Sequence, residues 1–260
     1  EALKMNEKSG NKKEIATNCG NIGAVFLEKK DYSKSLTYLS KALDMDKSLK
    51  NDAGVARHLG NIGNLYGEQK NYPAALNFYF SALKMDGELG NKNGIARHSG
   101  NIGSIYSSME KYDEALDYLL KAKEMDEALG SKEDLAVDLG NIGSVYIKTH
   151  KYSEAKKILE QSLSIAIEIN SLDDIRQGNE NLSEYYKETG NYQKALEYYE
   201  RATAAKDSLF NMEREEDITR KEMNYEFERK SAAAKAEQDK KDAATAAEIK
   251  SQKLIRDFSI

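Results

Sequence analysis

The sequence predicts an all-α protein, in which a solenoid of antiparallel helix pairs is followed by one long C-terminal helix. A 40-residue repeat carries this prediction, because the string GNIG recurs in register at Gly20, Gly60, Gly100 and Gly140. A fifth, degenerate copy follows at residues 181–183. The composition agrees, since one Pro in 260 residues and 32% charged residues favour helices over a β-sandwich or barrel.

The register extends well beyond the glycine string. Large aromatic residues recur at Phe26, Tyr66, Tyr106, Tyr146 and Tyr186, and a second ladder runs through Tyr32, Tyr72, Tyr112, Tyr152 and Tyr192. Small residues recur at Ser35, Ala75, Ala115, Ala155 and Ala195, and again at Ala42, Ala82, Ala122, Ser162 and Ala202. So many columns in register exclude chance, and a period of this length indicates a stacked repeat architecture.

The spacing within one copy is helical. Apolar or small residues follow the i, i+3, i+4, i+7 pattern of one helix face at Leu59, Ile62, Gly63 and Tyr66. After a polar break at residues 68–71, a second helix face begins, formed by Tyr72, Ala75, Leu76, Tyr79, Ala82 and Leu83. Turn-forming runs such as residues 90–94 separate the copies. Each unit is therefore predicted to be two antiparallel helices.

The paired glycines need a physical reason, because each costs roughly 1 kcal/mol relative to Ala inside a helix. We expect Gly63 and its equivalents to lie where the first helix nearly touches the second, opposite residues such as Ala75. The alternative, a phosphate-binding loop, is weak because these glycines follow no strand.

These residues resemble a known family. The pattern Leu59, Ile62, Gly63, Tyr66, Ala75, Tyr79 and Ala82 looks like the tetratricopeptide repeat. The 40-residue period resembles the longer-helix subclass of LGN/Pins-type adaptors and bacterial peptide receptors. Two departures are Leu59, where the family often has Trp, and Gly87, where Pro is common. The resemblance implies a right-handed superhelical solenoid that binds proteins or peptides and is not an enzyme.

Three segments are predicted. Residues 1–12 align with the second helix of a repeat and are expected to end a truncated preceding unit; residues 13–202 form five units; residues 203–260 form a long linker helix or coiled coil. The heptads of this last segment are poor, because Ile218, Tyr225, Ala232 and Ala246 share a frame that Asp239 and Lys253 interrupt. A weak homodimer through this helix is therefore predicted. The alternatives are a solvated single helix, or a cap on the last repeat formed by Leu209, Phe210, Ile218, Met223 and Phe227.

The C-terminal end and the linker suggest a membrane protein. The last residues turn apolar at Leu254, Ile255, Phe258 and Ile260, so a membrane-spanning segment is expected to begin here and continue beyond Ile260. Residues 207–211, with the helix that follows, resemble the linker of bacterial sensors whose output is a histidine kinase, a SpoIIE-type phosphatase or a nucleotide cyclase. The resemblance implies a membrane-tethered sensor with periplasmic repeats. The alternative is a cytoplasmic adaptor that holds partners together.

The candidate ligand-binding residues lie on the first helices, which line the groove in the resembling family. One column is always Asn, at Asn21, Asn61, Asn101, Asn141 and Asn181. An amide both donates and accepts, so it can pair with the backbone of an extended peptide. Four residues earlier lie Arg57 and Arg97, and one turn later Asn64 and Ser104, which suits an acidic ligand. The alternative is that the repeated Asn joins neighbouring first helices and only holds the stack together.

Other functions have little support in the sequence. A net charge of −5 and a pI near 5.5 argue against nucleic acid as a partner. His58 and His98 fall on adjacent helices, which lie about 8–10 Å apart, so a metal site is not expected. Cys19 occupies the Leu59 column and is expected to fill a small buried apolar position. No arrangement of nucleophile and base is evident, and neither catalysis nor a cofactor is predicted.

Overall fold

The computed structural model describes residues 12–258, with only part of the side chains from residue 213 onward. The segment predicted to end a preceding repeat, residues 1–12, therefore lies outside the described residues except for Lys12. The apolar side chains at Leu254, Ile255, Phe258 and Ile260 also lie outside them.

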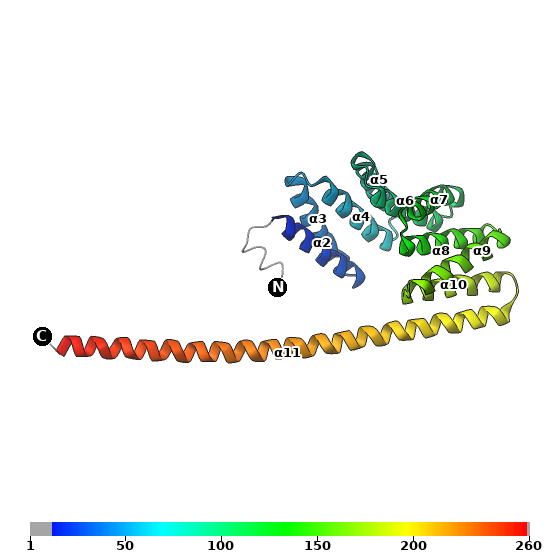
Figure 1. Cartoon of the computed structure of the whole chain (residues 1–260). Helices are drawn as coiled ribbons and strands as arrows, with labels where there is room; N and C mark the ends of the chain where they lie inside the picture. The colour runs from blue at the N-terminus through cyan, green and yellow to red at the C-terminus, as the bar shows by residue number, and fades with distance from the viewer. Residues whose placement is uncertain (1–11, 259–260) are drawn as a thin grey trace. The chain divides into compact units, whose positions relative to one another are not determined.

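The described residues form α-helices joined by short turns (Figure 1). By contacts it divides into two units, residues 1–206 and residues 207–260. The helices are α2 (Lys12–Glu28), α3 (Tyr32–Ser48), α4 (Asp52–Glu68), α5 (Tyr72–Leu89), α6 (Lys92–Ser108), α7 (Tyr112–Leu129), α8 (Lys132–Lys148), α9 (Tyr152–Glu168), α10 (Leu172–Glu188) and α11 (Tyr192–Phe258). The predicted all-α class is confirmed.

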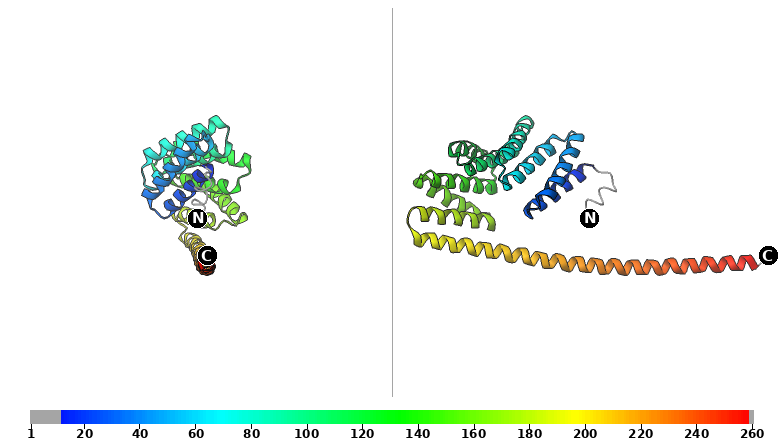
Figure 2. Two further views of the ribbon diagram at one scale, coloured as in Figure 1. Left: turned by 90° about the vertical axis from the view of Figure 1, so that its left-hand side faces the viewer. Right: turned by 180° about the vertical axis from the view of Figure 1, so that it is seen from behind.

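Within the first unit, consecutive helices pack as pairs, and each pair packs on the next (Figure 2). The pairs are α2 with α3, α4 with α5, α6 with α7, and α8 with α9. The fifth pair is α10 with the start of α11, where the hydroxyl of Ser183 donates to the carbonyl oxygen of Ala195 at 2.8 Å and the rings of Tyr186 and Tyr198 stack. First helices also contact one another, as α4 does α6.

Left-handed turn residues set the length of the helices. The residue with positive φ falls every 20 residues, at Lys30, Lys50, Lys70, Gly90, Glu110, Gly130, His150, Asn170 and Gly190. The left-handed conformation is unfavourable for residues other than glycine. It ends the helix at this point and lets the chain turn back. Side chains at the next helix start then accept a backbone N–H, as Asn71 does from Ala74 and Asn91 from Gly94. Two such turns make one 40-residue unit.

The second glycine of each GNIG string marks a close approach within a pair, one turn away from where the sequence placed it. A Cβ on Gly63 would lie 2.7 Å from the ring of Tyr79, and one on Gly143 would lie 2.3 Å from Leu159. The nearest neighbour is thus the Tyr79 column, although the expected Ala75 column is also close at Gly103, where the carbonyl oxygen of Ala115 would lie 3.0 Å from the added Cβ. The large side chain fills the space that glycine leaves, which offsets the helix cost of glycine.

The C-terminal helix differs from the predicted cap. α11 runs unbroken from Tyr192 to Phe258, so the turn that a folded-back cap requires is absent from the described residues. Among the candidate cap residues, Phe210, Ile218, Met223 and Phe227 are exposed. The long helix itself is as predicted. Pairing of this helix into a weak homodimer stays a prediction.

The membrane prediction is wrong. None of the helices in the described part of the chain combines the length and the apolar composition that crossing a bilayer requires. α11 has the length, with 67 residues, but charged residues recur throughout it. The expectation of a membrane-tethered chain with periplasmic repeats is therefore withdrawn.

Candidate peptide-binding groove

A cavity of about 800 Å³ opens where the C-terminal halves of three first helices meet. It gathers three of the residues predicted from sequence, Asn64, Asn101 and Ser104. The sequence did not indicate the remaining walls. They are apolar at Leu27, Gly67 and Ile105, aromatic at Tyr72 and Tyr79, polar at Ser108, and charged at Glu28, Lys30, Glu68 and Lys70. The cavity is large enough for several residues of a peptide.

Two amides at this cavity are held in a fixed orientation. The side-chain oxygen of Asn64 accepts from the hydroxyl of Tyr79 at 2.7 Å and from the side-chain NH2 of Asn101 at 3.3 Å. Burial raises the pKa of Tyr79, with the charge of Glu68 adding to the effect, so the hydroxyl keeps its proton. The NH2 of Asn64 and the oxygen of Asn101 are left as a donor and an acceptor for a ligand.

The predicted arginines lie one turn before Asn61 and Asn101. Arg57 and Arg97 are exposed, and neither forms an ion pair or a hydrogen bond with the residues that the structure describes. Asn21 and Asn61 likewise form no side-chain hydrogen bond within the described residues, and none of the four lines this cavity. These four side chains add polar groups to the surface of α2, α4 and α6 outside the cavity.

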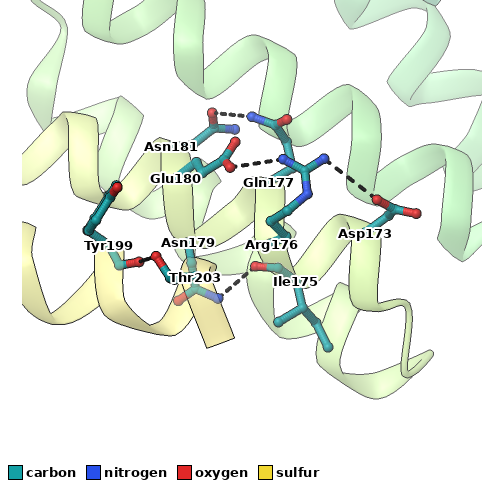
Figure 3. Close-up of polar contacts among 9 residues, drawn as sticks. All are labelled: Asp173, Ile175, Arg176, Gln177, Asn179, Glu180, Asn181, Tyr199 and Thr203. Atoms are coloured by element: carbon teal, nitrogen blue, oxygen red, sulfur yellow. Dashed lines mark hydrogen bonds and ion pairs between the residues drawn. The ribbon is translucent and has the colours of Figure 1, made fainter. Parts of the chain in front are cut away.

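The same column behaves differently toward the C-terminal end. Asn141 donates to the hydroxyl of Ser104 at 3.1 Å, and Asn181 is buried, donating to the carbonyl oxygen of Gly140 at 3.4 Å. Gln177 donates to Asn181 at 3.1 Å (Figure 3). The amides of Asn141 and Asn181 join neighbouring first helices, as the bond from Asn101 to Asn64 also does. Asn181 differs because it is buried as well, so the alternative interpretation fits that copy best.

A smaller cavity of about 260 Å³ lies beside Asn141 and Asn181. The guanidinium of Arg176, which lines this cavity, already forms ion pairs with two acids. It lies 3.6 Å from Asp173 and 2.9 Å from Glu180 (Figure 3). The positions equivalent to Arg57 and Arg97 hold Val137 and Gln177. This end of the stack therefore offers a ligand fewer free polar groups.

Buried polar pairs join the repeats, and sequence reasoning missed them. On the second helix of one repeat, Asp46 lies 3.0 Å from His58 on the first helix of the next, and Asp86 lies 3.1 Å from His98. Asn51 and Asn91 each donate to the second oxygen of the carboxylate. At the third junction the equivalent pair is Asp126 with Asp138. The signal was present as a column of acids, Asp46, Asp86 and Asp126, that stands 12 residues before a column of ionisable residues, His58, His98 and Asp138.

The two kinds of pair titrate in opposite directions. Burial, and then the charge of Arg97, lowers the pKa of His98 to about 4 even though Asp86 opposes this. Burial, with the acids Asp126 and Asp134 nearby, raises the pKa of Asp138 to about 8. Burial and Asp134 raise the pKa of Asp126 to about 6. The lowered pKa values favour neutral imidazoles at His58 and His98, whereas the raised pKa values favour a proton held between Asp126 and Asp138. The described residues contain no group of three metal-binding side chains.

Comparison with known families identifies the repeats. Two family models described as tetratricopeptide repeat match the chain, one at residues 14–88 and 94–168 and the other at residues 177–208. The chain belongs to the tetratricopeptide repeat family. The matched residues are accordingly a non-catalytic scaffold, as the sequence predicted. A search of the curated proteins returned no match.

Several solved structures share the fold at low identity. BtubC (BKLC) from P. vanneervenii is 20% identical with a TM-score of 0.67, and the match covers 80% of this chain and 88% of that one. The Rap conjugation gene regulator of plasmid pLS20, solved with the Phr* peptide, is 19% identical with a TM-score of 0.68; the match covers 78% of this chain and 56% of the regulator. A Rap protein complexed with competence and sporulation factor is 19% identical with a TM-score of 0.59, over 76% and 66% of the two chains.

Proposed function

We propose that this chain is an adaptor that binds an extended peptide or protein segment on the first helices α2, α4 and α6. The observation that carries the proposal is the amide pair Asn64 and Asn101, held by Tyr79 at the wall of the 800 Å³ cavity. One free donor and one free acceptor side by side match the C=O and N–H of a peptide backbone. Two similar structures are complexes of Rap proteins, one with a peptide named Phr* and the other with competence and sporulation factor.

The ligand is proposed to be acidic on the side that faces the arginines. Arg57 and Arg97 are exposed cations without an ion-pair partner among the described residues, and a guanidinium binds a carboxylate with two parallel hydrogen bonds. Within the cavity itself, Glu28 and Glu68 balance Lys30 and Lys70, so the charge preference is expected to come from the arginines.

Peptides selected from a random library against the whole chain test this function. Replacing both amides, Asn64→Ala with Asn101→Ala, should weaken a selected peptide at least tenfold in fluorescence polarisation, because a backbone group left unpaired on binding costs about 1–3 kcal/mol. Replacing both arginines, Arg57→Gln with Arg97→Gln, should weaken acidic peptides and flatten the dependence of their affinity on salt.

Asn181→Ala is the matched control, since it removes an amide of the same column from the C-terminal end. It should lower the melting temperature, because Gly140 loses its donor, but leave peptide affinity unchanged. If Asn181→Ala weakened binding as much as the double amide variant, or if the double variant bound normally with unchanged helicity, the proposed site would be wrong.

A further inference from the structure

The second helix of each repeat carries one large side chain that, in the first four repeats, packs both on the glycine of its own first helix and on the following repeat. In the first four repeats this side chain is Leu39, Tyr79, Leu119 or Leu159, and it is at most 4% exposed. The equivalent residue of the fifth repeat is Tyr199, which is 61% exposed. The second helix of the fifth repeat therefore exposes a face that the second helices of the first four repeats bury.

The covering residues in the four interior junctions are alike. They come from the first helix of the next repeat: Ile62 and Leu65 pack against Leu39, Ile102 and Ile105 against Tyr79, Ile142 and Val145 against Leu119, and Leu182 and Tyr186 against Leu159. One structural solution is thus repeated four times. It consists of an amphipathic helix whose large apolar side chains are three residues apart at the first three junctions and four residues apart, at Leu182 and Tyr186, at the fourth.

The uncovered face forms a continuous stripe on α11, which we call the end face. It contains Tyr192, Leu196, Tyr199, Thr203 and Lys206, whose alternating spacing of four and three residues puts them on one side of a helix. Tyr192 and Leu196 are 71% and 58% exposed, whereas the equivalent residues of earlier repeats are at least half-buried. Three large apolar side chains exposed side by side mark an interaction surface.

The charge on the end face also differs from the interior pattern. Lys206 occupies the column of the buried acids Asp46, Asp86 and Asp126. In the first three interior junctions the covering helix places its partner four residues before the first covering isoleucine, as His58 does before Ile62 and Asp138 before Ile142; the fourth junction has Ala166 and Gly178 at these positions and no such pair. Lys206 is exposed and forms no ion pair within the described residues. An acid at the matching position of a covering helix would complement it.

We infer that the end face binds an amphipathic α-helix of a partner protein, which continues the stack in the place of a next first helix. This helix carries an acidic residue at i and Ile, Val or Leu at i+4 and i+7. The interior junctions supply the spacing, and Lys206 supplies the preference for an acid. The inference is independent of the peptide site on α2 to α6.

The chain itself supplies a probe, because residues 132–148 contain this pattern as Asp138, Ile142 and Val145. A hydrocarbon-stapled, fluorescent peptide of this sequence should bind the whole chain, and Tyr199→Glu should weaken it at least tenfold. Glu197→Lys is the matched control, because Glu197 lies on the opposite side of the same helix. This variant should bind the probe as tightly as wild type. Equal binding by wild type and Tyr199→Glu would overturn the inference.

A charge exchange tests the partner chemistry. Lys206→Glu should weaken the probe about fivefold, and a probe with Asp138→Lys should restore binding to that variant while binding wild type poorly. If the Asp138→Lys probe did not restore binding to Lys206→Glu, the assignment of an acid to this position of the partner helix would be refuted. Sedimentation equilibrium of the chain alone addresses the competing occupant: a wild-type dimer abolished by Tyr199→Glu would assign the end face to a second copy and overturn the proposal of a separate partner helix.

Discussion

The N-terminal and C-terminal halves of the solenoid follow the same 40-residue register but differ in what they leave free. Around α4 and α6, Asp–His pairs fill the junctions, Arg57 and Arg97 are unpaired among the described residues, and the amides of Asn64 and Asn101 open onto an 800 Å³ cavity. Toward the C-terminal end, Asp126 on α7 lies beside Asp138 on α8, Asn181 is buried against Gly140, and a separate cavity of about 260 Å³ lies beside Asn141 and Asn181. The backbone repeat fixes the scaffold, whereas a few columns decide where a ligand can be held.

Substitution of the first glycine of a GNIG string should give the largest difference in stability between the two halves. A Cβ on Gly60 would lie 2.3 Å from the buried ring of His98, but one on Gly140 would meet its nearest neighbour, Asn181, at 3.3 Å. Gly60→Ala should therefore destabilise the chain by about 3 kcal/mol through overpacking. Gly140→Ala should be neutral or stabilising by up to about 1 kcal/mol, because Ala favours the helix. Urea denaturation of both variants measures the difference, and equal effects would contradict the junction geometry.

The junctions should also respond to pH with opposite signs. The pKa of His98 is lowered in the folded chain, so the unfolded chain binds the extra proton, and stability falls as pH drops from about 6.5 toward 4. The pKa values of Asp126 and Asp138 are raised, so the folded chain holds the extra proton, and stability falls as pH rises from about 4 through 8. Each contribution is expected to be a few kcal/mol, because one unit of pKa shift corresponds to about 1.4 kcal/mol.

Two variants isolate these contributions from the titration of the rest of the chain. His98→Gln should lose less stability than wild type between pH 6.5 and 4.5, and Asp138→Asn should lose less between pH 5 and 8.5. Chemical denaturation across this range measures both, and hydrogen exchange can assign each change to α5–α6 or to α7–α8. Parallel pH profiles for Asp138→Asn and wild type would show that the two aspartates do not share a proton.

The smallest expected effect comes from giving the C-terminal half an arginine. Val137 is exposed in the column of Arg57 and Arg97, so Val137→Arg extends the cationic stripe to α8. An added surface charge contributes about 0.5 kcal/mol, so an acidic selected peptide should bind two- to threefold tighter at low salt. Val137→Gln serves as the uncharged control, and the same gain from it would remove charge as the cause.

Much of this architecture follows from the sequence alone. The 40-residue register and the helical spacing after Leu59 predict the helix pairs. The asparagine column and the column one turn later predict that Asn101, Asn64 and Ser104 line one groove on the first helices. These features depend on local periodicity, which a sequence displays directly. The close approach of Gly63 was expected, but its neighbour is Tyr79 because the packed side chain leans along the helix.

Contacts between repeats could not be read with the same certainty. Asp46 and His58 stand 12 residues apart on different helices, and each, taken alone, resembles an ordinary surface residue. Whether an amide is free also depends on distances that the register does not contain, since Asn101 and Asn181 occupy one column and only Asn181 is buried against a backbone carbonyl. The membrane tether failed for a different reason, because it extrapolated from the apolar residues near Leu254 to a segment that the described helices do not contain.

Hydrogen exchange of the whole chain with and without a selected peptide tests the central claim most directly, because it locates the ligand without any substitution. The account predicts that a saturating peptide slows exchange in α2, α4 and α6, around Asn64 and Asn101, and leaves α8 and α10 unchanged. Protection confined to α8 and α10, or spread evenly over all first helices, would contradict the assignment of the binding site to the N-terminal half.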